Sequence, residues 1–110
     1  MATNVQLIDE ADRQPTVSTV VTVYTSPTNG AGTRITQFNA SLDSGTESFT
    51  VYYGAASGVI TKLIPLVSLT GPDSSTPADM INVFIPAGDN LYVQVTTGTT
   101  IKFSASGIEL

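Results

Sequence analysis

The sequence predicts an all-β fold, a single antiparallel β-sandwich with about eight short strands. Apolar and polar residues alternate strictly in several runs, most clearly at residues 91–95 and 101–105. Clusters of glycine, proline, asparagine and aspartate separate these runs, as they separate strands in antiparallel sheets. Apolar residues do not recur at the three- and four-residue spacing that an amphipathic helix requires. The number and spacing of the runs favour a jelly-roll-like sandwich, with a small barrel as the second choice.

Residues 80–106 contain three alternating runs and set the frame for the rest of the chain. The first run, residues 80–85, places its apolar residues on one face, and the turn cluster at residues 86–90 ends it. The second and third runs, residues 91–95 and 101–105, repeat the period of two. We interpret the three runs as an antiparallel meander with one buried face. The residues that we expect in the core are Phe49, Val51, Ile81, Val83, Leu91, Val93, Val95, Ile101 and Phe103.

The first 16 residues are expected to form an extended arm or connector ahead of a sandwich domain at residues 17–110. Within residues 1–8, Val5 and Leu7 lie on one side of an extended segment. Residues 9–15 then hold three of the nine acidic residues and end in a proline. A charge cluster of this kind is usually a solvated connector. The alternative is an arm that leaves the domain and docks on a neighbouring protein.

Three strands are expected in the first half of the domain, at residues 17–25, 34–42 and 47–53. The first is rich in valine and threonine, which favour a pleated strand, and it carries apolar side chains on both faces. In the second, Ile35 and Phe38 are out of phase, which predicts a β-bulge or a twist near Thr36 and Gln37. The third alternates, with Phe49, Val51 and Tyr53 inward and Thr50 and Tyr52 outward.

Two polar loops and a proline divide the remaining elements. Pro65, within residues 59–69, either separates two short strands or marks the edge of a sheet. Residues 26–32 form a turn cluster, and residues 70–79 form the longest polar stretch. The simple interpretation of this stretch is a surface loop. The alternative is a contact loop, because binding residues concentrate on loops that a rigid scaffold holds.

The chain is unusually poor in charge. Its 110 residues suffice for one domain, and only 12% of them are charged, against roughly 25% in typical soluble domains. Free domains use charged side chains to stay soluble and to protect sheet edges. We therefore expect much of the neutral surface to pack against other subunits; the alternative is a monomer with a threonine-rich surface. The net charge is −5 and the four cations are scattered, so direct binding to nucleic acid is not expected.

Several kinds of chemistry are excluded by residue type. The chain has no histidine and no cysteine, so a Ser-His-Asp triad, a thiolate nucleophile, a disulfide and the common zinc sites are impossible. A pair of carboxylates could still act as acid and base, but the candidates lie in or beside turns, where aspartate bonds to the local backbone. The candidates are Asp43, Glu47, Asp73, Asp79 and Asp89. We expect no enzyme activity, no cofactor and no metal. We also expect no signal peptide and no membrane span, because no basic region and no long apolar run follows Met1.

Four tyrosines offer a second interpretation of the surface. Aromatic rings can form a platform on which a sugar stacks, and sandwiches often hold lectin sites. The simpler interpretation is that the rings pack at strand edges or in interfaces, where an amphipathic side chain is favourable. The tyrosines are Tyr24, Tyr52, Tyr53 and Tyr92.

The succession of turns and strands resembles that of small all-β structural proteins of tailed bacteriophages, including capsid decoration (cement) proteins and fibre-associated proteins. The likeness covers roughly residues 17–110. It rests on the sequences YTSP before a turn at residues 24–27, SGT before FTVY at residues 44–52, IPAGD at residues 85–89 and SGIE at residues 106–109.

The resemblance implies a structural virion protein, made in the host cytoplasm, that assembles as a dimer or trimer and binds the exterior of a shell of major capsid protein. The competing class is a tail or fibre-associated module that binds host glycan. No catalytic residue is carried over. The candidate partner contacts, taken from the N-terminal segment and the polar loops, are Val5, Leu7, Asp9, Glu10, Asp12, Arg13, Asn29, Asp73, Ser74, Ser75 and Asp79.

Overall fold

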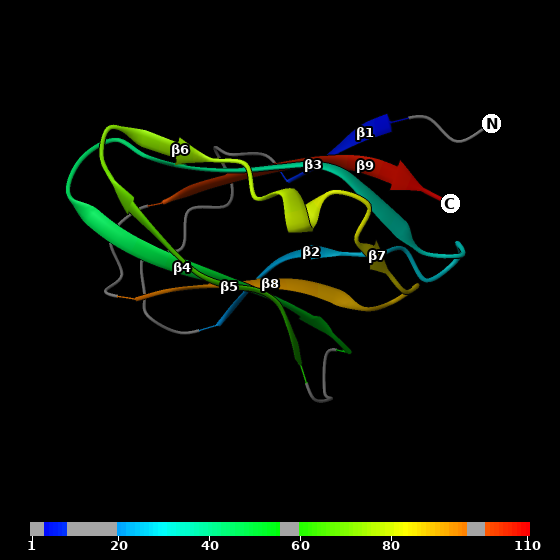
Figure 1. The fold of residues 1–110 in the computed structure, drawn as a ribbon. Helices are drawn as coiled ribbons and strands as arrows, with labels where there is room; N and C mark the ends of the chain where they lie inside the picture. The colour runs from blue at the N-terminus through cyan, green and yellow to red at the C-terminus, as the bar shows by residue number, and fades with distance from the viewer. Residues whose placement is uncertain (1–3, 9–19, 56–59, 97–100) are drawn as a thin grey trace.

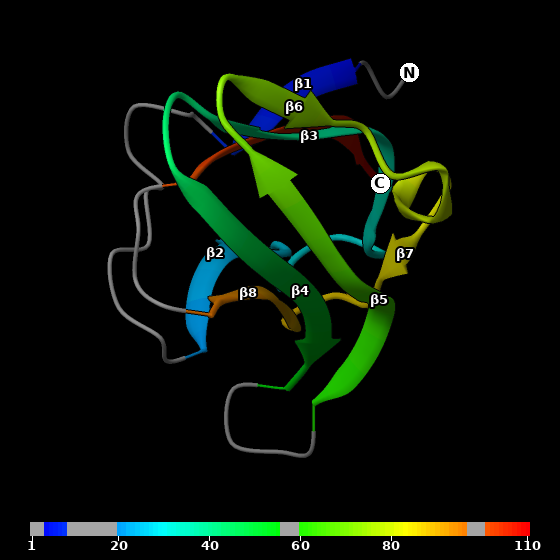
Figure 2. The same cartoon turned by 60° about the vertical axis from the view of Figure 1, so that its left-hand side comes forward.

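Two antiparallel sheets pack face to face, so the predicted all-β sandwich is confirmed. The computed structural model describes residues 4–8, 20–55, 60–96 and 101–110. Figure 1 shows the two layers from the side, and Figure 2 shows β1, β3 and β6 above β2, β8 and β4.

The five-stranded sheet has the order β1-β9-β3-β6, and the short strand β7 also pairs with β3. The four-stranded sheet has the order β2-β8-β4-β5. A 3-10 helix, η1 (Ala78–Met80), precedes β7. The first sheet comprises β1 (Asn4–Ile8), β9 (Lys102–Glu109), β3 (Thr33–Leu42), β6 (Asp73–Ser75) and β7 (Phe84–Ile85). The second comprises β2 (Val21–Thr25), β8 (Asn90–Val95), β4 (Thr46–Gly54) and β5 (Thr61–Thr70).

The pairing is nested. Strand β4 pairs with β5, β3 with β6, β2 with β8, and β1 with β9. Successive pairs alternate between the two sheets, so the chain resembles one long hairpin rolled into a sandwich. This is jelly-roll topology, and the small barrel that was the second choice is not formed.

The core lies between the sheets and is built from the inward residues of both. Three phenylalanines meet at its centre, because the ring of Phe103 lies 6.0 Å from that of Phe38 and 5.3 Å from that of Phe49. The second contact is edge to face, the arrangement that aromatic pairs favour. The expected core residues that are fully buried are Phe49, Val51, Leu91, Val93, Val95, Ile101 and Phe103.

The predicted bulge in the second strand is confirmed. The register between β3 and β9 shifts between Ile35 and Gln37, which brings both Ile35 and Phe38 into the core. Strand β5 is continuous through Pro65 and forms an edge of the four-stranded sheet. The second of the two interpretations of Pro65 is therefore the correct one.

The prediction for residues 80–85 is wrong in part. Ile81 is 51% exposed and Val83 is half-buried, and the only strand in this segment is β7. Asn82 adopts a left-handed conformation with φ of 69°, and its N–H donates to the carbonyl of Ile35. Because this turn interrupts the period of two, Ile81 is directed away from the core.

The proposed meander is also wrong. Strands β7, β8 and β9 do not pair with one another: β7 pairs with β3, β8 lies in the four-stranded sheet, and β9 lies in the five-stranded sheet. Alternation determines which side chains of a strand point inward. It does not determine which strand lies beside it.

Residues 4–8 belong to the sandwich rather than to a separate arm. They form β1, which pairs with β9 and puts Ile8 in the core at 1% exposure. Leu7 is half-buried against the same core. The predicted boundary at residue 16 lies outside the described residues, as does the first part of the strand predicted at residues 17–25.

Two connections between the sheets lie side by side at one end of the sandwich. The β3–β4 turn and the β5–β6 turn meet where the Gly71 N–H donates to the carbonyl of Gly45 at 2.7 Å. A Cβ atom on Gly71 would lie 2.5 Å from the backbone nitrogen of Ser44. Only glycine fits here without a shift of the backbone.

Candidate interaction surfaces

The outer face of the five-stranded sheet carries exposed apolar side chains at the end where the chain terminates. In register across β7, β3 and β9, Phe84 lies opposite Arg34, and Arg34 lies opposite Ile108. Phe84 is 45% exposed, and its ring covers the backbone of Gly32, because a Cβ atom there would contact the ring. Leu110, 48% exposed, pairs its backbone with Gly32 and Ala31. We call Phe84, Arg34, Ile108 and Leu110 the apolar end of this sheet.

The rest of this face is mainly neutral. Serine and asparagine occupy the outward positions of β9 and β3 beyond the apolar end, at Ser104, Ser106, Asn39 and Ser41. One ion pair is described at the far end, between Lys102 Nζ and Asp43 Oδ2 at 3.4 Å. A neutral face with exposed apolar groups at one end is the kind of surface that a protein partner covers.

The outer face of the four-stranded sheet has a different character. Three cross-strand rows run over it: Ser68, Ser48 and Thr96; Leu66, Thr50 and Gln94; and Tyr52, Tyr92 and Thr22. The charged residues of its strands are Glu47, which is buried, and Lys62. Ser48 and Ser68 share a hydroxyl–hydroxyl hydrogen bond of 2.9 Å. Neutral polar groups therefore predominate on this face.

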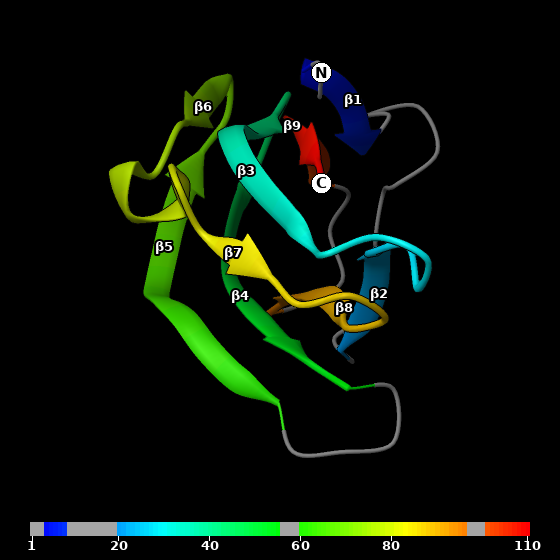
Figure 3. The same cartoon turned by 90° about the vertical axis from the view of Figure 1, so that its right-hand side faces the viewer.

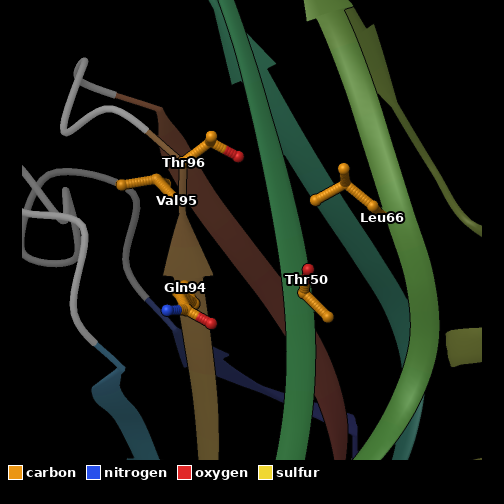
Figure 4. A pocket seen from close by; sticks show the side chains of 5 residues that line it. All are labelled: Thr50, Leu66, Gln94, Val95 and Thr96. Atoms are coloured by element: carbon orange, nitrogen blue, oxygen red, sulfur yellow. The ribbon is translucent and has the colours of Figure 1, made fainter.

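A hollow of about 230 Å³ lies on this face between β4, β5 and β8. Figure 4 shows the side chains that line it. Its polar groups are the hydroxyls of Thr50 and Thr96 and the amide of Gln94, and its aliphatic wall is Leu66, because the Val95 side chain is buried in the core and points away from the hollow (Figure 4). The lining residues are Thr50, Leu66, Gln94, Val95 and Thr96.

A β-bulge produces the hollow. Phe49 pairs with Val67 and Val51 pairs with Ile64, so two residues of β5 stand opposite Thr50 alone. The extra residue displaces β5 locally, and Leu66 is left 59% exposed. On the other side, Thr50 is in regular register with Gln94. The Tyr52 hydroxyl donates to Gln94 Oε1 at 3.2 Å and so fixes the amide beside the hollow.

The four tyrosines do not form one platform. Tyr52 and Tyr92 lie opposite each other on the four-stranded sheet, and Tyr92 is only 8% exposed. Tyr53 packs against the core. Tyr24 lies in β2 and bonds to residues of the other sheet. A stacking platform of all four rings, as considered from the sequence, is therefore not present.

Tyr24 ties the two sheets together. Its hydroxyl donates to Glu109 Oε2 at 2.5 Å and lies 2.8 Å from Thr33 Oγ1, which in turn lies 2.8 Å from Ser26 Oγ. Ser26 and Thr33 are fully buried. Burial and the hydrogen bond to the Glu109 carboxylate raise the pKa of Tyr24 to about 12. The phenol therefore stays protonated and keeps donating at neutral pH.

Two carboxylates that the sequence places near turns bond to the backbone. Glu47 is 2% exposed, and its Oε1 accepts from the N–H groups of Ser48 and Thr96 at 2.9 and 3.0 Å. Asp73 Oδ1 accepts from the N–H of Ser74 at 2.8 Å. Within the described part of the chain, carboxylates do not gather in any group of three or more that could hold a metal ion.

The candidate contacts predicted from the sequence lie mainly on the five-stranded sheet and are not gathered at one point. Val5 is exposed on the edge strand β1, and Asp73 and Ser74 are exposed on β6 at the opposite edge. Figure 3 shows β1 and β6 at opposite edges of the upper sheet, with β3 and β9 between them. Ser75 is half-buried in β6, Asp79 is exposed in η1, and Asn29 is exposed in the β2–β3 turn. Asp9, Glu10, Asp12 and Arg13 lie outside the described residues.

Sequence reasoning missed both the apolar end and the hollow. A signal for the first was present, since Phe84 and Ile108 are apolar residues in the outward phase of their runs. The hollow depends on the offset between two strands, and no pattern within either strand reports that offset.

Comparisons with family models, with curated proteins and with solved structures find no match for this chain. Among the helices of the described residues, none is long and apolar enough to cross a membrane.

Proposed function

We propose that this protein is a capsid decoration (cement) protein that binds the exterior of an assembled shell of major capsid protein. The observation that carries the proposal is the outer face of the five-stranded sheet, where Phe84 and Leu110 are exposed beside Arg34 on a mainly neutral sheet. Burying this face removes the apolar surface of Phe84 and Leu110 from water, and Arg34 is the charged group of the apolar end that must be paired when it is buried.

Of the candidate contacts, Ser74 belongs to the same face, because it pairs with the outward residue Ser41, whereas Val5 and Asp73 pair with the inward positions Gly107 and Leu42. Strands β1 and β6, which carry Val5, Asp73 and Ser74, are the two edges of this sheet. A shell that contacted the apolar end and both edges would engage the sheet along its full width. In this proposal the acidic segment at residues 9–15 also contacts the shell, beyond the end of β1.

The proposed role is structural and not catalytic. Binding the assembled shell, and not its free subunits, stabilises the shell by mass action. Dimers or trimers of the chain would span neighbouring shell subunits, and contacts repeated over a symmetric lattice would strengthen attachment through multivalency.

The test is co-sedimentation of the purified protein with undecorated capsids of the virus that carries its gene. Phe84→Asp and Leu110→Asp place a charge on the apolar end and should each prevent sedimentation with the capsids. Leu66→Asp is the matched control, since Leu66 is also an exposed leucine, at 59% against 48% for Leu110, and lies on the opposite sheet. It should sediment like the unaltered protein, and circular dichroism should show that all three variants are folded.

Failure of the unaltered protein to sediment with capsids would refute the decoration role. Retained binding by both charged variants would refute the assigned face. The N-terminal contact needs a separate variant, because deleting residues 1–14 would remove β1 and uncover Ile8. Replacing Asp9, Glu10 and Asp12 by their amides keeps β1, and weaker sedimentation is expected.

A further inference from the structure

We infer that the hollow on the four-stranded sheet binds a single neutral sugar residue, so that the protein carries a glycan site on the side away from its proposed shell contact. The hollow is defined by Thr50, Leu66, Gln94, Val95 and Thr96. The inference goes beyond the decoration role and does not depend on it.

The lining excludes other classes of ligand on chemical grounds. The residues around the hollow are uncharged, so an ionised ligand would lose water without gaining a counter-charge. A wholly apolar ligand would cover the polar groups of Thr50 and Gln94 without offering them a hydrogen bond, which is also unfavourable; the Thr96 hydroxyl already donates to the Ser48 carbonyl at 3.4 Å. A ligand with neutral hydroxyl groups avoids both costs.

The positions of the polar and apolar groups match a sugar ring. Hydroxyl and amide groups both donate and accept, so the groups on β4 and β8 suit the mixed hydroxyl edge of a pyranose. Leu66 stands on the opposite wall, on β5 (Figure 4), where it can cover the C–H face of the ring. The hydrogen bond from Tyr52 holds the Gln94 amide in place before any ligand arrives, which reduces the entropy lost on binding.

The size of the hollow limits the ligand. At about 230 Å³ it is smaller than the pockets of roughly 300–1,000 Å³ that hold drug-sized ligands. One sugar residue is the expected occupant, and its Kd is expected to be millimolar because so few atoms make contact. Many copies on one particle would convert this weak binding into firm attachment to a glycan-coated surface.

The experiment is a titration followed by the backbone amide signals of the ¹⁵N-labelled protein. Glucose, galactose, mannose and N-acetylglucosamine are added separately to about 100 mM, well above the Kd expected for so small a ligand. At least one should cause saturable shifts in the amides of Thr50, Gln94 and Thr96. Glucuronate, which carries a charge, should bind more weakly than the best neutral sugar.

Two variants test the site and one serves as the control. Thr50→Val removes one hydroxyl group with almost no change of shape and should raise the Kd by roughly threefold to tenfold. Leu66→Asp replaces the apolar wall by a charge and should abolish saturation. Thr28→Val makes the same chemical change as Thr50→Val in an exposed turn outside the hollow and should leave the Kd unchanged.

The inference is overturned if no neutral sugar saturates, if the shifts lie away from the hollow, or if Thr50→Val and Leu66→Asp bind like the unaltered protein. Tighter binding of glucuronate would overturn the neutral class. Failure of the sugar-binding inference is distinct from failure of the decoration role. Phe84→Asp should keep sugar binding and lose capsid binding, whereas Leu66→Asp should keep capsid binding and lose sugar binding.

Discussion

The two outer faces of this sandwich have similar composition but different surface shapes. On the five-stranded sheet, apolar residues stand exposed at one end, with Phe84 and Leu110 beside Arg34. On the four-stranded sheet, the side chain of Leu66 is exposed, and it borders a hollow that is lined by hydroxyl and amide groups. The first surface suits a broad protein contact and the second a small polar ligand. Low charge alone, which both faces share, does not distinguish these uses.

The largest expected effect is on folding, when a charge is placed on the inner rather than the outer side of the four-stranded sheet. Val93→Asp should abolish folding, because an ionised carboxylate in the core costs an amount comparable with the whole stability of a domain, about 5–15 kcal/mol. Val93 is fully buried in β8, whereas Thr22 on the adjacent strand β2 is exposed. Thermal unfolding followed by circular dichroism should show a normal transition for Thr22→Asp.

A milder change at the same core position gives a graded result. Val93→Ala should reduce the free energy of unfolding by about 1–3 kcal/mol, from the lost methyl groups and the cavity left behind. Urea denaturation measures this loss. A Val93→Asp variant with an unchanged melting temperature would show that the assigned inner face is wrong.

The next effect concerns the end of the sandwich where two connections between the sheets touch. Gly71→Ala should cost about 2–3 kcal/mol, because the new Cβ would press on the backbone of Ser44 and force it to move. Gly45 has a φ of 80° and open space around it, so Gly45→Ala should cost only about 1 kcal/mol of backbone strain. Equal losses in urea denaturation would mean that the two connections are not in close contact.

The opposite end is joined by hydrogen bonds from Tyr24. Tyr24→Phe should lower the free energy of unfolding by about 1 kcal/mol at pH 7, from the loss of a partly exposed hydrogen bond. The pKa of Tyr24 is raised from its ordinary value of 10.0 to about 12 in the folded protein. The stability that the protonated phenol contributes is therefore fully present below pH 10 and is lost as the pH rises through about 12.

Comparing the two proteins by denaturation between pH 8 and pH 12 isolates this contribution, within the range set by the two pKa values of Tyr24. The difference between the unaltered protein and Tyr24→Phe should shrink as the pH rises above 10. A constant difference would mean that burial and the Glu109 carboxylate do not raise the pKa of Tyr24 in the folded protein.

The smallest effect is expected for the ion pair on the five-stranded sheet. Lys102→Met should change the free energy of unfolding by only about 0.5 kcal/mol, because Asp43 is largely exposed and water screens the pair. Denaturation at low and high salt should give nearly the same small difference. A large, salt-sensitive loss would mean that charge contributes more to this face than its neutral neighbours suggest.

The alternation of apolar residues predicted the inward side chains well, and it predicted little about partners. Val93 and Phe103 are buried as expected, because the face of a strand depends only on local geometry. That they lie in different sheets depends on pairing between distant segments. The prediction that Ile81 lies in the core is wrong. The alternation looks continuous in the sequence, but the left-handed turn at Asn82 interrupts it and leaves Ile81 exposed.

The candidate contacts were predicted less well than the fold. The resemblance and the loop composition pointed to Val5 and Asp73, which are at opposite edges of one sheet. The apolar end is formed by residues that are far apart in the sequence, such as Phe84, Arg34 and Leu110. Such a surface is formed only by the pairing of the strands, so no single segment of the sequence contains it.

The nested pairing also determines when the protein can fold during synthesis. Strands β4 and β5 are neighbours in the sequence and can pair early, whereas β1 must wait for β9, which lies at residues Lys102–Glu109. Until β9 leaves the ribosome, β1 and β3 lack the strand that lies between them. Long-range pairing of this kind folds slowly and leaves strand edges open in the meantime. A nascent chain would therefore be most exposed to aggregation just before its last strand is complete.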